Sequence, residues 1–474
     1  MTHPAPAADR LPARRLDAMG HPQVDRGAVL RLALPLMLNS VIQALLSLTD
    51  TWFVGHISTE ALAAIASVYF LLMLIIFFLS GVTLCVQTLV AQAFGAGRYR
   101  RAGEALWSGL WSALLVAPAF LLLASLGRPV LGLFALDPAI EDYAVAFWQP
   151  RLWGGPFAAA LMGLMGFFNG IGRTRTTLAI TAAVVVVNAA LNGLFIFHLG
   201  LGIAGSAWAT TCAQVVGVVV ALRLFLRHEP RRYRPLATWR PRATRLLRQF
   251  TLGLPMAAGG AADMASAALF QIMQVRMSAA DGAATQIVMM LTSLVYMPGI
   301  GFALAGTTLV GQAIGAGDRN WAARLGDTVI LMVATMMGAI GVAIALAGPW
   351  LVPLFVGSTD PQAGAVLPLA ITLLWIAAVY QFFDGLNFGS ALCLRGAGDA
   401  TVPAVLVLGL GACLFVPLTH LLTFPAGGGY VPSLPGAGLG AIGGWSALVV
   451  YVLLLGTLLF RRWRHGAWRR IRLD

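Results

Sequence analysis

The sequence predicts an all-α membrane protein with twelve transmembrane helices in two six-helix lobes, related by a pseudo-two-fold axis along the membrane normal. The chain of 474 residues is 59% hydrophobic and only 10% charged, whereas a soluble domain carries about 25% charged residues. The segment QTLVAQAFGAG at 87–97 recurs as TTLVGQAIGAG at 307–317. A duplicated, bilayer-spanning chain is typical of transporters, whose substrate site lies between the repeats.

The predicted spans are long apolar runs, each near the roughly 20 apolar residues that a spanning helix needs. They lack the alternation of apolar and polar residues that marks a membrane strand, so we expect helices. The twelve spans lie near 28–54, 61–92, 104–126, 143–168, 177–198, 203–226, 248–276, 283–313, 322–347, 364–391, 402–423 and 439–460.

The arginines predict the orientation of the chain in the membrane. The net charge is +13, and the basic side chains are all arginine, with no lysine. They cluster near 98–101, 173–175, 223–248, 319–324, 395 and 461–472. The loops at 55–60, 199–202, 348–363 and 424–438 have none, and 127–142 has only Arg128. Since short cytoplasmic loops carry the positive excess, we expect both termini in the cytoplasm of a bacterial inner membrane and no nucleic-acid partner.

Composition divides the chain into five parts. The strongest break is the basic, proline-containing stretch near the middle, which predicts a linker between two lobes. We expect a disordered cytoplasmic amino terminus without a removable signal peptide at 1–27, an amino-terminal six-helix lobe at 28–227, a basic cytoplasmic linker at 228–247, a carboxy-terminal six-helix lobe at 248–461 and a basic cytoplasmic tail at 462–474.

Three further pairs of similar segments follow the same order in both halves. They are LALPLMLNS at 32–40 with LGLPMAAGG at 252–260, NGIGRTRT at 169–176 with RGAGDATV at 395–402, and GLGIAGSAWA at 200–209 with GLGAIGGWSA at 438–447. Because each lobe has six spans, it begins and ends on the same side of the membrane. The two lobes are therefore parallel repeats.

No pattern indicates an enzyme or a bound cofactor. The chain contains no H-E-x-x-H and no G-x-S-x-G sequence. Both G-x-G-x-x-G sequences, at 200–205 and 438–443, lie between membrane helices rather than after a strand, so we interpret them as tight turns. The four cysteines lie in or beside different spans without metal-ligand spacing. We expect no cofactor other than a transported Na⁺ or H⁺.

Three carboxylates lie inside apolar stretches, namely Asp50, Asp263 and Asp384. A charge at the bilayer centre costs about 2.5–3.5 kcal/mol on insertion scales, which favours a functional role. A carboxylate held away from water can bind a proton, a sodium ion or an organic cation, and each ligand weakens the others electrostatically. The alternative is a polar link between helices. It fits Asp50 best, since Gly55 and His56 follow it toward a loop.

Two asparagines extend the first of these sites. Asn188 and Asn192 are four residues apart, so they share one face of the fifth span. With Asp50 they would form an oxygen cage for a small cation, a candidate Na⁺ site. Two asparagines at this spacing can equally bond to neighbouring helices, and both interpretations stay open.

Polar and aromatic residues surround the second site. Tyr380, Gln381 and Asn387 lie on the same helix face as Asp384. An aromatic ring beside a carboxylate suits a flat organic cation. Arg151, in the fourth span, could extend toward the surface or line the cavity. The predicted substrate-binding residues are Asp263, Asp384, Tyr380, Gln381 and Asn387, and the predicted coupling-ion residues are Asp50, Asn188, Asn192 and Asp384.

Together these segments resemble the multidrug and toxic compound extrusion (MATE) family, over essentially the whole chain after residue 28. The resemblance rests on LALPLMLNS…LTDTWFVGH, TLVAQAFGAG, GIGRTRT, LNGLFIFHLGLGIAGSAWAT, GLPMAAGGAAD, MPGIGFALAGTTLVGQAIGAG and FFDGLNFGSALCLRGAGDATVP. It implies twelve helices in two bundles, alternating access, and export of organic cations driven by inward Na⁺ or H⁺.

The resemblance also assigns individual acids. Asp50 matches the family's first-helix acid and Asp384 its tenth-helix acid. Asp263 stands where NorM-like members usually carry glutamate, so this acid is shorter here. Asn188 and Asn192 fit the NorM-like branch, whereas the DinF-like branch usually has an acid where Asn192 stands.

We therefore expect a monomeric antiporter, coupled to Na⁺ or H⁺, that exports organic cations and drugs by alternating access. The first alternative is a flippase of the same superfamily that moves a lipid-linked sugar or another amphiphile. Such a protein often has a cationic cavity, whereas the charges inside the membrane spans here are mainly acidic. The second alternative is a membrane enzyme, for which the spans provide no cluster of His and Asp. Substrate range and coupling ion stay open.

Overall fold

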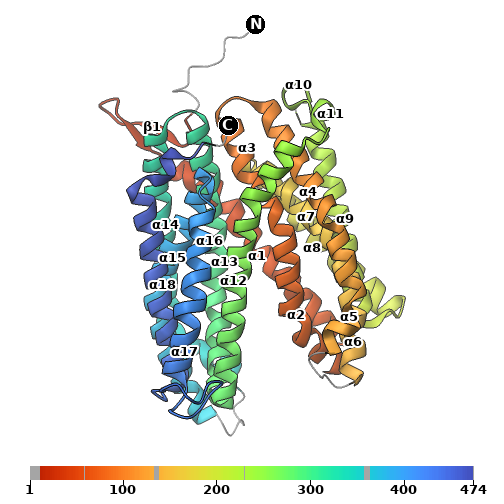
Figure 1. The fold of residues 1–474 in the computed structure, drawn as a ribbon, viewed down its shortest axis with the longest axis vertical. Coiled ribbons are helices and arrows are strands. Elements are labelled where there is room, and N and C mark those ends of the chain that lie inside the picture. Colours follow the sequence, from red (N-terminus) through yellow and green to blue (C-terminus); the bar gives the residue numbers. More distant parts are fainter. Residues whose placement is uncertain (1–10, 58, 133–137, 229, 357–362, 473–474) are drawn as a thin grey trace.

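The computed structural model of this protein describes residues 11–57, 59–132, 138–228, 230–356 and 363–472. Two helical bundles stand side by side (Figure 1), and the helices α1–α9 and α12–α18 form one each. The hairpin of β1 and β2 and the last turn of α18 lie at the same end of the molecule, which we call the terminal end. The predicted architecture of two lobes is therefore confirmed.

The amino-terminal lobe crosses the bundle six times, twice in interrupted spans. A short 3₁₀ turn at Gly81–Thr83 joins α2 to α3, and α6 meets α7 at Gly154. Its helices are α1 (Arg26–Gly55), α2 (Thr59–Ser80), α3 (Val86–Gly95), α4 (Tyr99–Ser125), α5 (Gly127–Leu131), α6 (Pro138–Trp153), α7 (Gly155–Gly170), α8 (Thr174–Asn192) and α9 (Gly202–Arg227).

The carboxy-terminal lobe also crosses six times. The short helices α10 (Pro230–Tyr233) and α11 (Pro235–Thr238) connect it to the first lobe. Its helices are α12 (Ala243–Met277), α13 (Ala279–Gly315), α14 (Arg319–Leu351), α15 (Ala363–Ala397), α16 (Thr401–Leu410), α17 (Val416–Thr423) and α18 (Gly440–His465), with a π-helical turn at Gly411–Phe415 between α16 and α17.

In the described part of the chain, ten helical segments are long and apolar enough to cross a membrane. The two further spans are α6–α7 and α12, which run along the bundles beside the others (Figure 1). The first is divided at Gly154, so each half is only 16 residues long. The second is rich in glycine and polar residues. With these two, each lobe has its six predicted spans.

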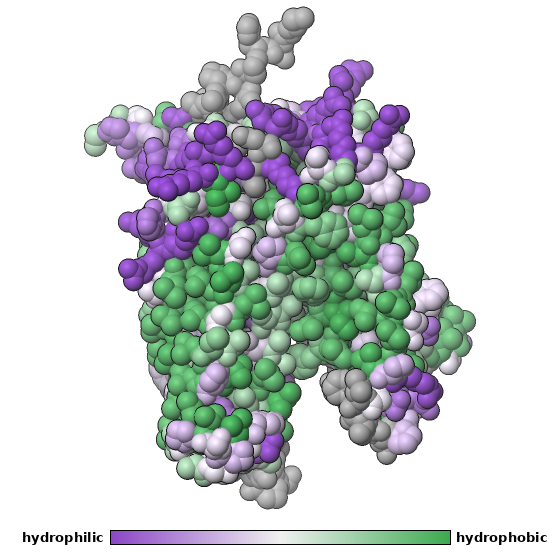
Figure 2. All heavy atoms as spheres, viewed as in Figure 1, coloured by the Kyte–Doolittle hydropathy of each residue, from purple (hydrophilic) through white to green (hydrophobic). Residues whose placement is uncertain are grey.

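Polarity along the bundle agrees with a membrane protein. Hydrophilic residues gather over the terminal end, and a hydrophobic surface covers the middle of both lobes (Figure 2). Two arginines lie at the opposite end. Arg128 forms an exposed ion pair with Asp142 at 2.7 Å, and Arg276, which lies outside the predicted loops, has its guanidinium carbon 4.0 Å from the ring centre of Tyr430.

The segment at 1–27, which we expected to be disordered, contains an antiparallel hairpin of β1 (Arg14–Leu16) and β2 (Pro22–Val24). Residues 1–10 lie outside the described residues. The hairpin region is attached to the carboxy-terminal lobe, because the indole nitrogen of Trp321 donates to the carbonyl of Pro12 at 3.0 Å. Val24 packs against the apolar core of that lobe. The segment is polar on average, so its composition did not reveal these few apolar and aromatic contacts.

The two copies of the repeated segment meet where the lobes touch. A Cβ atom on Gly95 of α3 would collide with the backbone of Gln312 on α13, and one on Gly315 would collide with the backbone of Gln92. The contact is thus reciprocal, and only glycine allows the backbones to approach this closely. We call this contact, formed by 87–97 and 307–317, the seam.

Four hydrogen bonds repeat the same exchange between the seam and the last turns of α7 and α15. Each repeat donates to the turn of the other lobe, at positions that correspond in the duplication. The donors and acceptors are Thr88 to the carbonyl of Arg395 (3.0 Å), Thr308 to that of Asn169 (2.9 Å), Gln92 to that of Gly396 (2.9 Å) and Gln312 to that of Gly170 (2.8 Å). The seam lies at the terminal end, and the lobes separate toward the other end, where a cleft opens (Figure 2).

Replacing Gly95 with alanine should destabilise the protein, because the new methyl group collides with backbone that has no alternative position. We expect a loss of about 1–3 kcal/mol, as for other overpacked sites. Thermal unfolding of the detergent-purified chain measures it. Gly409→Ala is the matched control, since its Cβ would meet nothing within 4 Å. Equal unfolding temperatures for both variants would contradict the role of the seam.

Candidate functional site

The first buried carboxylate, Asp50 on α1, lies against α8. The amide nitrogen of Asn192 donates to Asp50 Oδ1 at 2.8 Å, and that of Asn188 donates to the same oxygen at 3.1 Å. Both asparagines are fully buried. The structure therefore brings together the three residues that the sequence grouped by helical spacing, while their role as an ion site stays a prediction.

A fourth member of this cluster, Thr210 on α9, was missed from the sequence. Its hydroxyl donates to Asp50 Oδ2 at 2.9 Å. It also lies within hydrogen-bonding distance of the Ser206 carbonyl on its own helix, at 3.2 Å. A single hydroxyl in an apolar helix usually bonds to its own backbone, so the sequence offered no specific signal.

Arg151 on α6 is enclosed in the protein rather than extended to the surface, with only 8% of the residue exposed. It interacts electrostatically with Asp50. Its Nη1 atom has no hydrogen-bond partner among the described residues. Asp50 thus has three neutral hydrogen-bond donors and interacts electrostatically with one guanidinium.

This cluster also limits how a sodium ion could bind. Sodium requires oxygen ligands, yet both asparagines turn their amide nitrogens to Asp50. The Oδ1 atom of Asn188 accepts a bond from Asn192, whereas Oδ1 of Asn192 has no partner among the described residues. A cation here would therefore use the carboxylate and Asn192 Oδ1, and it would compete with Arg151 for the negative charge.

The second site lies in the other lobe around Asp384 on α15, which is 6% exposed. Asn387, one turn away, donates from Nδ2 to Asp384 Oδ1 at 3.2 Å. On the preceding turn, Gln381 Nε2 donates to the Tyr380 hydroxyl at 3.4 Å, and Gln381 Oε1 has no partner among the described residues. The four predicted residues on α15 are thus adjacent, but only Asn387 bonds to the carboxylate.

Asp263 on α12 belongs to the same site. Its charge acts electrostatically on Asp384, although the two residues are 121 positions apart in the sequence (384 − 263). Tyr296 on α13 and Tyr451 on α18 interact electrostatically with both acids. Neither tyrosine was predicted, because each is a single residue on its helix and gives no spacing signal.

The charge balance of the two sites differs. Among the described residues, no arginine forms an ion pair with Asp263 or Asp384, whereas Asp50 faces Arg151. Two carboxylates with phenol and amide neighbours, and without a basic partner, attract a cation. The carboxy-terminal site is therefore the one suited to a positively charged ligand.

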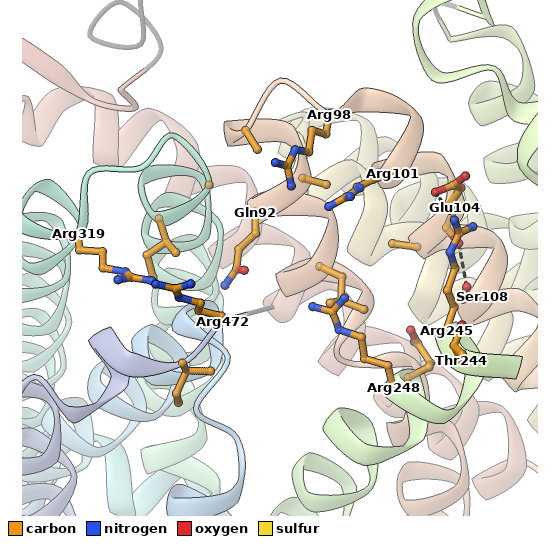
Figure 3. A pocket seen from close by; sticks show the side chains of 18 residues that line it. Gln92, Arg98, Arg101, Glu104, Ser108, Thr244, Arg245, Arg248, Arg319 and Arg472 are labelled. Atoms are coloured by element: carbon orange, nitrogen blue, oxygen red, sulfur yellow. Dashed lines mark hydrogen bonds and ion pairs between the residues drawn. The ribbon is translucent and has the colours of Figure 1, made fainter. Parts of the chain in front are cut away.

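A third polar region was not predicted from the sequence. A cavity of about 650 Å³ lies at the terminal end and is lined by several arginines and residues of the seam (Figure 3). None of the predicted site residues lines it. Its position separates it from both carboxylate sites.

Comparison with known proteins places both lobes in one family. A family model described as MatE matches residues 35–194 and 255–420. The chain is 30% identical over 449 residues to a protein of Bradyrhizobium diazoefficiens named "Probable multidrug resistance protein NorM", covering 93% of this chain and 94% of that one. A relative of the same name from Pseudomonas putida is 31% identical over 435 residues, covering 88% and 92%.

Solved structures share the fold at lower sequence identity. One, described as the outward-facing conformation of a multidrug resistance MATE family transporter, has a TM-score of 0.80 at 19% identity and covers 94% of this chain and 96% of its own. A second, a transporter from Pyrococcus furiosus described as having a binding pocket of reverse polarity, has a TM-score of 0.77 at 20% identity, with 94% and 96% covered.

The electrostatic interaction between Asp50 and Arg151 predicts energetic coupling. Asp50→Asn and Arg151→Gln should each lower stability, because each leaves the other group buried with less compensation. The double variant should lose less than the sum, by about 0.5–3 kcal/mol. Thermal unfolding of the four proteins measures this cycle.

The exposed pair of Arg128 and Asp142 is the control for that cycle. Their ion pair is as short as 2.7 Å, yet both side chains are about two-thirds exposed, at 68% and 66%. We expect the cycle of Arg128→Gln and Asp142→Asn to couple by less than about 1 kcal/mol. Additive losses at Asp50 and Arg151 would show that their charges act independently.

Proposed function

The chain belongs to the MATE family of multidrug efflux transporters, and from this premise we propose that it is a cation-coupled antiporter that exports organic cations and drugs by alternating access. It is a multi-pass bacterial membrane protein that moves small molecules and is not an enzyme. The observation that carries the proposal is the pair Asp263 and Asp384, which lies inside the carboxy-terminal lobe without a basic partner among the described residues.

The proposed substrate site consists of Asp263, Asp384, Tyr380, Gln381 and Asn387. The carboxylates supply the charge that a cationic drug needs, and the phenol rings supply a flat, polarisable surface. Asn387 holds Asp384 in one orientation through its hydrogen bond of 3.2 Å. Tyr296 and Tyr451, which interact with both acids, join this proposed site.

The proposed coupling ion, Na⁺ or H⁺, binds at Asp50 with Asn188 and Asn192, and at Asp384. A cation at Asp384 competes directly with a cationic substrate, which is the simplest basis for antiport. A cation at Asp50 acts differently, since it weakens the attraction between Asp50 and Arg151. Either ion changes the preferred conformation only if its affinity differs between the two facing states.

The proposed orientation places the chain in the bacterial inner membrane, active as a monomer, with both termini in the cytoplasm. The hydrophilic surface at the terminal end supports it (Figure 2). In this orientation the seam closes the cytoplasmic side and the cleft opens outward. Releasing the seam would be part of the change to an inward-facing state.

The alternative, a flippase for a lipid-linked sugar or another amphiphile, requires a cationic cavity at membrane depth. The arginine-lined cavity lies instead at the terminal end, beside the seam. The charges inside the spans of the carboxy-terminal lobe are acidic at Asp263 and Asp384. These placements favour cationic cargo.

Replacing Asp384 with asparagine should reduce ethidium efflux by at least about tenfold, because the site loses the charge that binds the cation. Efflux from vesicles carrying the variant measures this, and a membrane blot checks that insertion is normal. Asp142→Asn removes an exposed carboxylate and should transport like the parent chain. Normal efflux by a correctly inserted Asp384 variant would remove the central role of this acid.

Separate ion gradients identify the coupling ion. Reconstituted vesicles are given either a Na⁺ gradient at equal pH or a pH gradient without Na⁺, and ethidium movement is followed in each. We expect one gradient to drive efflux and Asp50→Asn to abolish that response, since the charge that attracts the ion is lost. If Asp50→Asn retains the full response, Asp50 does not hold the coupling ion.

A further inference from the structure

The cavity of about 650 Å³ at the terminal end is built from both lobes and the carboxy-terminal tail (Figure 3). Its volume is in the range of small-molecule sites, which span about 300–1,000 Å³. Six arginines line it, namely Arg98, Arg101, Arg245, Arg248, Arg319 and Arg472. Figure 3 shows these side chains arranged around one central space.

Three of the six arginines that line this cavity lack a compensating carboxylate among the described residues. Its one acid, Glu104, is ion-paired with Arg245 at 2.8 Å and with Arg100, which lies outside the cavity lining, at 3.5 Å. Among the described residues, Arg98, Arg101 and Arg319 have no carboxylate within ion-pair distance. Several like charges held around one space repel one another unless an anion lies between them.

The general excess of arginine at the terminal end does not explain why six arginines line one cavity. Arg175 and Arg324 are also exposed near the terminal end, and neither lines it. Orientation in the membrane requires arginines in the loops, but not their convergence from α4, α12, α14 and the carboxy-terminal tail on one space. The convergence therefore points to a ligand.

We propose that this cavity binds a phosphate-bearing anion that bridges the two lobes. Arginine presents a planar fork of donors that matches the oxygens of phosphate in two parallel hydrogen bonds. Arg98 and Arg101 approach from the amino-terminal lobe and Arg319 from the other, so a phosphate-bearing anion in the cavity would lie between basic side chains of both lobes. The remaining volume accommodates the rest of the molecule, either the headgroup of an anionic phospholipid or a soluble phosphate compound.

The position of the ligand couples it to the movement of the lobes. Gln92 and Gly315 of the seam line the same cavity. An anion held there stabilises the state in which the seam is closed, because opening the seam would move Arg101 and Arg319 apart. By linkage, the anion would bind more weakly to the other state and slow the exchange between them. This second step rests on the proposed function, whereas binding itself does not.

The test uses the full chain in nanodiscs of zwitterionic phosphatidylcholine, titrated with inorganic pyrophosphate by calorimetry and by thermal unfolding. A second arm replaces part of the lipid with phosphatidylglycerol and adds no phosphate. The variant Arg101→Gln/Arg319→Gln is compared with Arg175→Gln/Arg324→Gln, which removes the same charge from the same end outside the cavity. Ethidium efflux is measured in parallel.

We expect pyrophosphate, phosphatidylglycerol or both to raise the unfolding temperature of the parent chain and of the control. The cavity variant should respond at least about tenfold more weakly, since two charge-assisted contacts are lost. A response to pyrophosphate identifies a soluble ligand, and a response to phosphatidylglycerol alone identifies the lipid headgroup.

The proposal is overturned if the parent chain responds to neither probe, or if the cavity variant and its control respond equally. The titration of the parent chain shows whether the cavity binds either probe, even if the double variant does not fold. Arg319→Lys, which keeps the charge and loses the planar fork, then replaces the double variant and should bind pyrophosphate more weakly than Arg324→Lys. Binding without any effect on efflux would leave the site in place and contradict only its link to the lobe movement.

Discussion

The reciprocal contact between the two copies of one segment is the constraint on which this structure depends. Gly95 lies against the backbone of Gln312, and Gly315 lies against the backbone of Gln92. Each copy also donates hydrogen bonds to the turn that ends a helix of the other lobe. Because this contact closes one end of the molecule, it determines that the cleft opens at the other (Figure 2).

The same contact explains why charges gather where they do. The helices that continue from the seam begin with arginines, so closing the seam draws Arg101 and Arg319 toward one cavity. Within the spans the balance is reversed. Asp263 and Asp384 share an apolar setting with tyrosines, whereas Asp50 is held by neutral donors and faces Arg151. The two lobes are alike in fold and different in charge, which suits different roles for their carboxylates.

Several features of the site could be predicted because they depend on local spacing. Asn188 and Asn192 share a helix face at i and i+4, and both contact Asp50. Asn387 contacts Asp384 for the same reason. Three further residues approach the carboxylates from other helices, namely Thr210, Tyr296 and Tyr451. Each is a single residue on its helix, so no spacing pattern in the sequence predicts its role. Arg151 could not be placed, because a long side chain in an outer third of a span can turn either way.

The sequence by itself determined the class of the protein, the number of spans, the duplication and the identity of the costly acids. These follow from hydropathy and repetition, which are properties of the chain in order along its length. Only the tertiary structure decided which lobe surfaces touch, that Asp263 interacts electrostatically with Asp384, and that arginines from distant segments line one cavity. Such contacts depend on how helices pack across the bundle, and packing is set by shape and close approach that no linear pattern records.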